Sequence, residues 1–294
     1  MSSSDWNIKN ILEVTSEYLK KKAINNPRLS AELLLAHLLK KSRVALYLSF
    51  DQPLNEAEIN EYRSLVMRCV AREPIQYITG KQEFWSMEFD VDKRVLIPRP
   101  ESELLVEQVI ALCGKTGSFE EQSPRILDMG TGSGAIAISI AQEIKNARIW
   151  ASDISNSALD VAIGNAKKHG MIDRIRFLQG DLFQPFRDLS QKFDIIISNP
   201  PYIPSEDYPS LQPEVRDYEP RLALDGNEKG MFFIREIITQ GQEFLDHAGW
   251  LLIEMDPEQT PMAFETIEGT GGYREKKRIK DYSRRYRIVL AKKK

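Results

Sequence analysis

The sequence predicts an α/β protein built on a parallel, doubly wound sheet and preceded by a small helical region. Three observations predict it. Strands and helices alternate after Arg125, a glycine-rich turn follows the first of these strands, and the first 75 residues show helical periodicity. In such a sheet ligands bind at the carboxyl ends of the strands, so we expect the functional residues directly after the strands.

Composition is that of a soluble globular protein with one large domain and a smaller one. The chain has 294 residues, of which 42% are hydrophobic and 28% charged, and its net charge is −3. General attraction to nucleic acid or to an anionic membrane is therefore not expected. Cys69 and Cys113 have neither metal nor redox spacing, which favours reduced thiols. With no signal peptide and no apolar run of about 18 residues, we expect a cytoplasmic protein that acts without a membrane.

Residues 1–75 are expected to form a small helical bundle. Apolar residues recur at helical spacing in 7–22, 28–40 and 55–72, and Asn55 with Glu58 forms a candidate capping pair before the last of these helices. Positive and negative charges roughly balance in this region. The bundle is therefore expected to be a docking module for a protein substrate, or a structural one, rather than a nucleic-acid clamp.

The remainder divides into a linker, residues 76–100, and a sheet domain, residues 101–294. The linker is rich in aromatic and β-branched residues without helical spacing, so it predicts a β-hairpin. In the sheet domain, strands are predicted at 125–129, 147–153, 174–181, 193–198 and 249–255, helices at 101–112, 135–144, 156–168 and 231–245, and a terminal hairpin around 273–280 and 285–291.

A glycine-rich loop follows the first strand of the sheet domain, and it consists of Gly130, Thr131, Gly132, Ser133 and Gly134. Glycines at a strand-to-helix turn allow a tight turn and a close approach of the backbone to a ligand. The loop is therefore a candidate cofactor site. Dinucleotide-binding enzymes use similar loops, and a turn that binds nothing has the same pattern.

Two acids lie at the carboxyl ends of the next two strands. Asp153 comes 23 positions after Gly130, where a carboxylate can accept hydrogen bonds from both ribose hydroxyls of a nucleoside. A lone Asp here would more often cap a helix, but Ser155 can take that role. Asp181 can meet the exocyclic amine of an adenine, although a turn aspartate explains it equally well. With the glycine loop, these acids favour a nucleoside ligand.

The fourth strand, FDIIIS, stops at the corner Asn199-Pro200-Pro201-Tyr202. Two prolines end sheet pairing, because proline has no N–H and a fixed φ. A hydride-transfer enzyme has no need of this corner. A methyltransferase acting on a planar nitrogen does, because the nitrogen lone pair is delocalised and its two N–H groups must be held by acceptors. The Asn199 side-chain oxygen and the Pro200 carbonyl are two such acceptors, preset by the prolines, and Tyr202 can stack on the planar target.

The corner therefore favours an enzyme that transfers a methyl group from S-adenosyl-L-methionine, with S-adenosyl-L-homocysteine as product, over a dinucleotide-dependent enzyme. Asn199, Pro200 and Tyr202 are the candidate catalytic residues. We expect direct transfer without a covalent enzyme intermediate, a metal or a strong general base, because an N-methylated amide cation is acidic. The three histidines, His37, His169 and His247, lie in or beside helical stretches and are better explained as surface or packing residues.

Most of the chain resembles the release factor glutamine methyltransferase family (HemK/PrmC). The stretches that carry the resemblance are REPIQYITG (72–80), VLIPRPESELLVE (95–107), ILDMGTGSGAIAI (126–138), ISNPPYI (197–203) and EPRLALDGNEKG (219–230). The glycine loop and NPPY occur in many methyltransferases, whereas the other three stretches are more specific. The resemblance implies a class I, Rossmann-like, seven-stranded methyltransferase domain after a helical domain, and methylation of the glutamine side-chain amide in the GGQ motif of peptide chain release factors.

The resemblance also implies site residues. Residues 130–134, Asp153, Leu182 after Asp181, and Asn199 are expected to hold the cofactor, and Asn199, Pro200, Pro201 and Tyr202 to hold the glutamine. Family members often carry an aromatic residue at the position of Leu182, so adenine packing is expected to be looser or supplied by Phe183. The family pattern RPET is RPES here, which keeps a hydroxyl.

Two alternatives come from other classes: an adenine-N6 DNA methyltransferase with the same corner, and a non-catalytic adapter that binds adenosylmethionine or a nucleotide. Between Asn199 and Glu268 there are fifteen Asp and Glu but four Lys and Arg. A DNA-binding enzyme is expected to surround its site with cations, so this balance argues against DNA. The intact NPPY corner argues against a degenerate adapter. The basic C-terminal run from Arg274 is explained by a solvated hairpin face, with RNA contact left open.

Residues 203–229 are rich in Pro, Asp and Glu with little periodicity. A loop of this length is uncommon unless it is functional, so we expect it to form a peptide-binding wall. Arg99 and Glu101 are candidate substrate-binding residues, although a charge pair at a helix start explains them equally well. We expect the protein to be monomeric on its own.

Overall fold

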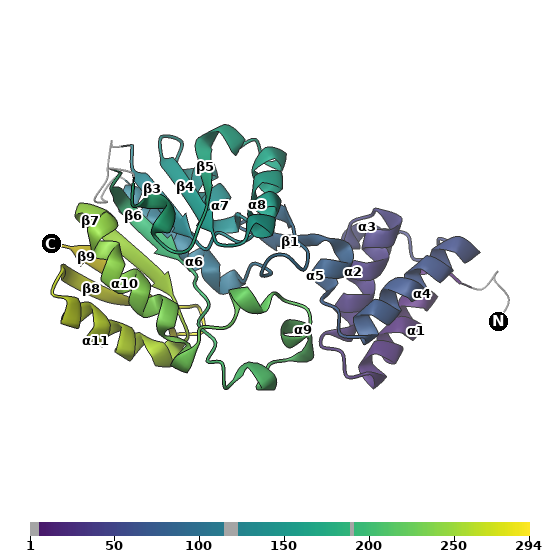
Figure 1. Ribbon diagram of the computed structural model, residues 1–294. Helices are drawn as coiled ribbons and strands as arrows, with labels where there is room; N and C mark the ends of the chain where they lie inside the picture. Colours follow the sequence, from purple (N-terminus) through teal and green to yellow (C-terminus); the bar gives the residue numbers. More distant parts are fainter. Residues whose placement is uncertain (1–5, 115–122, 189–190) are drawn as a thin grey trace. The chain divides into compact units, whose positions relative to one another are not determined.

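The computed structural model describes residues 6–114, 123–188 and 191–294. The chain forms two compact units (Figure 1), each with its own hydrophobic core. The first comprises Met1–Lys81 and Gln212–Tyr218, and the second comprises Gln82–Leu211 and Glu219–Lys294.

The first unit is helical. It contains α1 (Ile8–Lys21), α2 (Pro27–Leu39), α3 (Arg43–Leu48), α4 (Glu56–Val70), α5 (Ile75–Thr79) and α9 (Pro213–Arg216). The three predicted helices correspond to α1, α2 and α4, and the capping pair of Asn55 and Glu58 is present at the start of α4. The sequence did not predict α3 and α5, because helices of six and five residues are too short to show a period.

An ion pair joins the two chain segments of this unit. Arg72 Nη1 contacts Glu214 Oε1 at 3.0 Å, and the Tyr218 hydroxyl donates to the Ala71 carbonyl at 2.7 Å. Residues 212–218 are therefore part of the helical unit, although they lie in the middle of the long segment that the sequence presents as a single loop.

The predicted hairpin is confirmed as a separate two-stranded sheet, β1 (Lys81–Phe84) and β2 (Met87–Asp90). Phe84 and Phe89 are buried in the core of the second unit, which anchors the hairpin there. A side-chain contact fixes its end, since the Asp90 amide donates to Asn165 Oδ1 at 2.8 Å.

The second unit contains the predicted seven-stranded sheet, with strand order β5-β4-β3-β6-β7-β9-β8. Strands β3 to β7 are mutually parallel, as the sequence predicts. Strand β9 is antiparallel to β7, and β8 pairs antiparallel with β9 in the predicted terminal hairpin. The strands are β3 (Arg125–Met129), β4 (Arg148–Asp153), β5 (Ile175–Gln179), β6 (Phe193–Ser198), β7 (Leu245–Glu254), β8 (Tyr273–Lys280) and β9 (Tyr286–Lys293).

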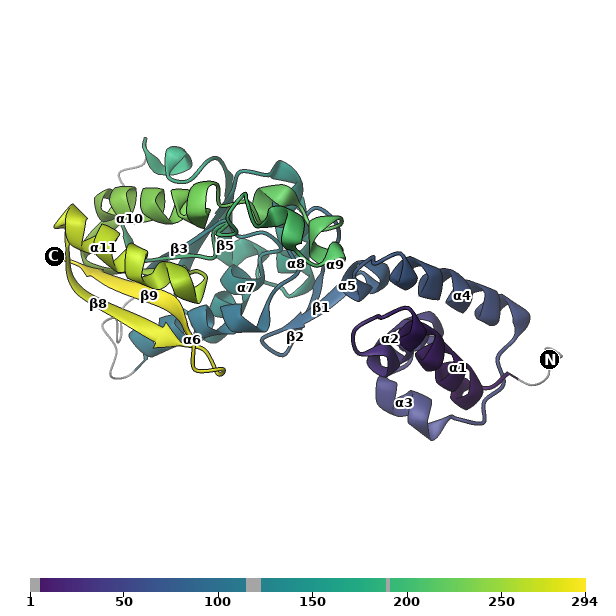
Figure 2. The ribbon, with the colours of Figure 1, turned by 90° about the horizontal axis from the view of Figure 1, so that it is seen from below.

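Helices cover both faces of this sheet. One face packs against α6 (Glu103–Cys113), α7 (Ala135–Glu143) and α8 (Asn156–Lys168), and the other against α10 (Phe232–Phe244) and α11 (Thr260–Thr270). Figure 2 shows α6 and α10 on opposite sides of the strands. Successive residues of β6 alternate between the faces: Ile195 and Ile197 join the first core cluster and Ile196 joins the second. No helix in residues 6–114, 123–188 and 191–294 has the length and apolarity needed to cross a bilayer.

Short helical turns connect the larger elements. They are η2 (Pro100–Ser102), η3 (Ile172–Arg174), η4 (Gln184–Phe186), η5 (Tyr208–Ser210), η6 (Arg221–Ala223), η7 (Glu228–Gly230) and η8 (Pro257–Gln259). Three of these turns, together with α9, lie in or at the end of residues 203–229, so this segment is less irregular than its composition suggests.

The register of the parallel strands aligns their carboxyl ends. Met129 lies beside both Ser152 and Ser198, and Ser198 in turn lies beside Ile253. Strand order reverses at β3, because β4 and β5 extend to one side of it and β6 and β7 to the other. The residues that follow these strands therefore meet at one edge of the sheet, at its topological switch point.

Candidate active site

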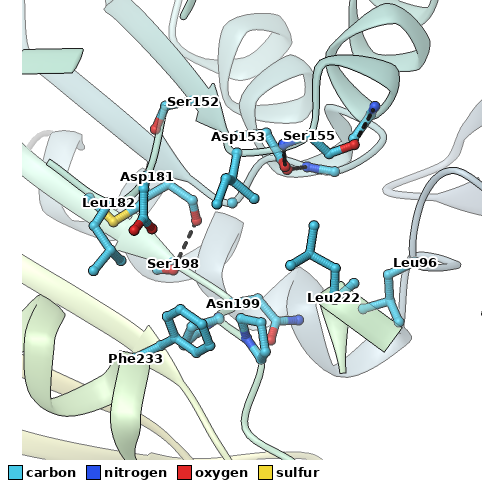
Figure 3. A pocket seen from close by; sticks show the side chains of 18 of the residues that line it. Leu96, Ser152, Asp153, Ser155, Asp181, Leu182, Ser198, Asn199, Leu222 and Phe233 are labelled. Atoms are coloured by element: carbon cyan, nitrogen blue, oxygen red, sulfur yellow. Dashed lines mark hydrogen bonds between the residues drawn. The ribbon is translucent and has the colours of Figure 1, made fainter. Parts of the chain in front are cut away.

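A pocket lies at this edge, and every residue that lines it belongs to the second unit (Figure 3). Its wall is mostly apolar with a few carboxylates, hydroxyls and one amide. Of the sequence-predicted site residues, it brings together Gly130, Gly132, Asp153, Asp181, Leu182, Asn199, Pro200 and Pro201.

The glycine loop gives the pocket an open backbone wall. Gly130 and Gly132 have φ of +73° and +56°, and a Cβ added at either would meet nothing within 4 Å. The space in front of these two glycines is therefore free for a ligand to approach the backbone. Gly134 serves a different purpose: with φ of +81°, its Cβ would approach the Ala162 Cβ to 3.1 Å, so it allows α7 and α8 to pack closely.

Thr131 and Ser133 face away from the pocket and fix the loop. The Thr131 hydroxyl donates to Asp128 Oδ2 at 2.7 Å, and the Ser133 carbonyl accepts from Asn165 at 2.9 Å. Both side chains are buried, and neither lines the pocket.

Asp128 is a site residue that sequence reasoning missed. Its Oδ2 also accepts from the Ala137 amide at 3.2 Å, so this carboxyl joins the loop to the first turn of α7. Complete burial raises its pKa to about 7, against the lowering effect of these hydrogen bonds. A carboxyl between the apolar residues Leu127 and Met129 of the strand RILDM was the available signal.

Asp153 braces the same loop while facing the pocket. Its Oδ2 accepts from the Gly132 amide at 2.9 Å and its Oδ1 from the Ser155 amide at 2.9 Å. Burial raises the pKa of Asp153, and the backbone N–H donors oppose that rise. Ser155 caps α8 by accepting from the Ala158 amide at 3.2 Å, so Asp153 is not needed as the cap. Each Asp153 oxygen keeps a lone pair for further donors.

Asp181 and Leu182 line the side of the pocket that lies away from Leu96 and Leu222, as Figure 3 shows. Leu182 has φ of +46°, which turns the chain sharply after Asp181. The suggestion that Phe183 packs on an adenine is wrong. Phe183 is fully buried, stacks on Phe244 with ring centroids 4.5 Å apart, and does not line the pocket.

The corner at Asn199 presents two unpaired acceptors. Asn199 Nδ2 donates to the Ser102 hydroxyl at 3.0 Å, which leaves Oδ1 as the free end of the amide. Within the part of the chain that the structure describes, no group donates to Asn199 Oδ1 or to the Pro200 carbonyl. Because both residues line the pocket, the two acceptors are available to a bound molecule.

Residues 224–230 hold the corner from behind. The Ile203 amide donates to the Leu224 carbonyl at 2.9 Å, and the Gly226 amide donates back to the Ile203 carbonyl at 2.8 Å. A Cβ at Gly226 would approach the Pro201 carbonyl oxygen to 2.8 Å, and one at Gly230 would overlap the Tyr202 carbonyl oxygen. Only glycine allows this close approach, so the DGNEKG stretch is fitted to the backbone of NPPY.

Tyr202 does not line the pocket. It packs against the core cluster under α10, and burial raises the pKa of its hydroxyl. Its carbonyl accepts from Gln259 Nε2 at 2.7 Å. The stacking role expected for Tyr202 stays a prediction.

Arg99 and Glu101 also lie off the pocket wall. Arg99 Nη2 donates to Glu219 Oε1 at 2.6 Å, and Glu219 Oε2 accepts from the Ile97 amide at 3.2 Å. Glu219 is 5% exposed, and this burial raises its pKa against the lowering effect of Arg99. Arg99 therefore ties the IPRP segment to the EPRL segment, and its expected contact with substrate stays a prediction, as does that of Glu101.

The apolar part of the wall was missed by sequence reasoning. Leu96, Ile154, Leu222 and Phe233 line the pocket, and Ile154 and Leu222 are about half exposed, at 47% and 54%. Figure 3 shows Leu96 and Leu222 on the side away from Asp181 and Leu182. The sequence does contain a signal for these residues. Ile154 directly follows a predicted strand and Leu222 lies in a segment rich in Pro, Asp and Glu, and both positions are usually polar.

These residues fit S-adenosylmethionine. The open space before Gly130 and Gly132 admits a ligand against the backbone, Asp153 offers carboxylate oxygens to hydroxyl groups, and Ile154 with Leu182 offers apolar surface to a planar base. The pocket also carries carboxylates suited to a cationic group.

Comparisons with known proteins agree with the geometry. The family described as the PrmC N-terminal domain matches residues 10–80, and a methyltransferase domain family matches residues 120–243. A methyltransferase from Pyrococcus furiosus shares the fold at a TM-score of 0.51 and 17% identity, covering 80% of this chain and 98% of its own. The human methyltransferase 10 domain containing protein does so at a TM-score of 0.52 and 16% identity, covering 71% and 89%.

Relatives in sequence are more similar. The release factor glutamine methyltransferase of Geobacter sulfurreducens is 41% identical over 90% of each chain. That of Chlorobaculum tepidum is 43% identical over 85% of each chain. That of Rhodopirellula baltica is 38% identical over 98% of this chain and 97% of its own.

The fold, the pocket and these matches define an S-adenosylmethionine-dependent class I methyltransferase. Within that class, the chain belongs to the release factor glutamine methyltransferase family. Family membership favours neither the DNA methyltransferase nor the non-catalytic adapter.

Proposed function

We propose that this protein transfers a methyl group from S-adenosyl-L-methionine to the side-chain amide nitrogen (N5) of the glutamine in the GGQ motif of peptide chain release factors, and so modulates translation termination. The observation that carries the proposal is the pair of unpaired acceptors, Asn199 Oδ1 and the Pro200 carbonyl, on the pocket wall. A primary amide has two N–H donors on one nitrogen, which matches two acceptors that neighbouring residues present. The relatives named release factor glutamine methyltransferase support the same substrate.

The acceptors activate the amide by orientation. When Asn199 Oδ1 and the Pro200 carbonyl accept the two N–H groups, the planar nitrogen is held with one face toward the cofactor side of the pocket. Pro200 and Pro201 restrict the backbone, so the acceptors need little reorganisation when substrate binds. The bound cofactor supplies an electrophilic methyl group on a sulfonium.

The cofactor wall has binding roles. Gly130 and Gly132 admit the ligand against the loop backbone, Asp153 accepts from ribose hydroxyls, and Asp181 with Leu182 borders the base. The apolar residues Leu96, Leu222 and Phe233 exclude water from the space between the two substrates, which strengthens the hydrogen bonds at the corner.

The remaining expectations concern partners. The acid-rich stretch from Asn199 to Glu268 supports a protein rather than DNA as substrate. Residues 203–229, Arg99 and Glu101 are proposed to contact the peptide that carries GGQ, Tyr202 to stack on its amide, and the helical unit to dock the release factor. We further propose that the protein acts as a monomer and works in the cytoplasm, where release factors work.

The test uses the purified protein, methyl-labelled S-adenosylmethionine and purified release factor. A variant factor with GGA in place of GGQ and a duplex DNA serve as matched alternative substrates. We expect label in the wild-type factor alone, in a single glutamine by mass spectrometry. Equal labelling of the GGA variant, or label in DNA, would refute the proposal.

A further inference from the structure

The carboxyl end of β7 brings an unused acid beside the corner. Ser198 pairs with Ile253, so the next residues of the two strands, Asn199 and Glu254, emerge side by side at the sheet edge. Glu254 is 1% exposed, and it does not line the pocket. Burying a carboxyl away from both solvent and ligand costs stability, so its position one strand away from Asn199 needs an explanation.

Ser102 connects this acid to Asn199. The turn η2 places Ser102, which is 3% exposed, so that its hydroxyl accepts from Asn199 Nδ2 at 3.0 Å. The same hydroxyl lies close enough to the Glu254 carboxyl to lower the pKa of that acid. Oxygen Oε2 of that carboxyl finds no hydrogen-bond partner in the described part of the chain. The Ser102 hydroxyl is therefore a donor available to the Glu254 carboxyl.

The direction of this chain of hydrogen bonds follows from its donors. A hydroxyl has one hydrogen, and an ionised carboxylate can only accept. When Glu254 is ionised, the Ser102 hydrogen must point to it, which leaves a lone pair on Ser102 Oγ toward Asn199. Only the NH₂ end of the Asn199 amide can satisfy that lone pair, so Oδ1 is turned to the pocket.

We propose that Glu254 and Ser102 are positioning residues, which select the Asn199 amide orientation that presents Oδ1 to the substrate nitrogen. This inference rests on the proposed function, because it assigns a task to Asn199 in amide methylation. With Glu254 protonated, the carboxyl can donate to Ser102, the Ser102 hydrogen can point to Asn199, and a flipped amide then presents its NH₂ group to the substrate N–H groups. Two donors facing each other do not bind, so the flipped state is inactive.

The charged groups around Glu254 set the pH at which this happens. Arg287 approaches from β9, Arg99 directly precedes η2, and Glu101 lies within η2. The Tyr202 hydroxyl lies near the same carboxyl. Burial raises the pKa of Glu254 to about 7, while Arg287, Arg99 and the Ser102 hydrogen bond oppose that rise. Since the ionised form is the active one, turnover is expected to increase with pH through this range.

The experiment compares Ser102→Ala, Ser102→Thr and Glu254→Gln with wild type. Ser139→Ala is the matched control, because Ser139 is also a fully buried serine but lies on α7 with an unpaired hydroxyl. In single-turnover methylation of release factor at saturating cofactor, we expect losses of about 10- to 100-fold for Ser102→Ala and Glu254→Gln, and a rate near wild type for Ser102→Thr and Ser139→Ala. Cofactor affinity is expected to stay within about twofold in all four.

Two further readouts separate positioning from stability. The wild-type rate should rise with pH around 7, whereas Glu254→Gln should be flat, since its amide can serve either direction of the chain at any pH. Affinity of the S-adenosylhomocysteine-bound protein for a Gly-Gly-Gln peptide, measured by calorimetry, should fall in Ser102→Ala and recover in Ser102→Thr. An unchanged rate in Ser102→Ala, or a wild-type pH profile in Glu254→Gln, would overturn the inference alone. A wild-type protein that leaves GGQ unlabelled would instead overturn the proposed function.

Discussion

The two walls of the pocket are built in different ways. On the cofactor wall the hydrogen bonds are nearly local: Thr131 and Asp128 are three positions apart, Ser155 and Asp153 two, and Gly132 and Asp153 twenty-one. On the substrate wall Asn199 is held by Ser102 from 97 positions away, and Tyr202 by Gln259 from 57. The corner itself is four residues long, but its shape depends on segments spread over most of the second unit.

This difference has a functional meaning. A cofactor site made from successive strands and the turns after them can be reused with many substrates. The hydrogen bonds that Asp128 and Asp153 make to its loop join residues at most twenty-one positions apart. The substrate site is completed by the IPRPES and EPRLALDGNEKG stretches, which reach the corner through Ser102 and Gly230. Those stretches carry the more specific resemblance to the family, and the structure gives a physical reason for it.

The largest effect is expected from Asn199→Ala, which removes one of the two acceptors of the substrate wall. We expect the methylation rate to fall by about 10²- to 10³-fold or more, because the amide nitrogen is no longer oriented. Cofactor affinity, measured by calorimetry, should change far less, because the cofactor wall is intact. Asn146→Ala, at an exposed position of the second unit that does not line the pocket, is the control. Full activity in Asn199→Ala would refute its role as an acceptor.

The second prediction concerns the glycine behind the corner. Gly230→Ala places a Cβ onto the Tyr202 carbonyl oxygen, at a residue with φ of +65°. We expect a loss of about 3 kcal/mol in the free energy of unfolding together with most of the activity, because backbone must move on both sides of the contact. Chemical denaturation measures the first and labelled methyl transfer the second.

Gly271→Ala is the matched control for backbone strain. Gly271 has φ of +64°, but its Cβ would meet nothing within 4 Å. It therefore carries the penalty of the left-handed conformation without the overlap, and it should cost about 1 kcal/mol with activity retained. Equal losses in the two variants would show that the close approach to Tyr202 is unimportant.

A third prediction tests the cofactor wall with the same substitution. Gly132→Ala adds a Cβ in open space in front of the loop, so the free energy of unfolding should change by about the same 1 kcal/mol as in Gly271→Ala. Affinity for S-adenosylmethionine should fall by about tenfold or more, because the methyl group occupies the approach to the backbone. Calorimetric titration against the Gly271→Ala protein isolates the effect. Unchanged affinity would place the cofactor elsewhere.

The contrast also explains what the sequence could predict. The alternation of strands and helices and the period of α1, α2 and α4 are local properties, and they were predicted together with Gly130, Asp153 and Asn199 on the pocket wall. Gly130 and Asn199 directly follow strands and Asp153 ends one, and parallel strands bring their carboxyl ends together.

Long-range contacts escaped the sequence. Pairing of Asn199 with Ser102, the closeness of Gly230 to Tyr202 and the burial of Phe183 against Phe244 depend on how segments pack after the chain folds. The position of Phe183 next to Leu182 suggested an adenine contact, but neighbouring residues after a strand face different ways, and Phe183 faces the core. Arg99 illustrates the same limit, because its ion-pair partner, Glu219, lies 120 positions away in the sequence and no local pattern predicts the pair.

The last prediction concerns stability rather than activity, at Asp128, the buried acid beside the glycine loop. Its pKa is near 3.8 in the unfolded chain and about 7 in the folded protein, so between these values the folded state keeps a proton that the unfolded state releases. Raising the pH from about 4 to about 7 therefore lowers the free energy of unfolding through this group. In Asp128→Asn, an oxygen acceptor for Thr131 is kept and the titration is gone.

The measurement compares thermal unfolding of wild type and Asp128→Asn without cofactor at pH 5 and pH 8. In the variant, the NH₂ group takes the place of Asp128 Oδ1, which has no hydrogen-bond partner. This unpaired NH₂ group does not titrate, so it changes the free energy of unfolding equally at both pH values. The difference between variant and wild type should therefore become more favourable to the variant by about 1–3 kcal/mol at pH 8. Other buried acids, Glu254 among them, titrate in both proteins and cancel. Parallel pH profiles would mean that Asp128 is ionised across the whole range. Its hydrogen bonds from Thr131 and Ala137 would then lower its pKa more than burial raises it.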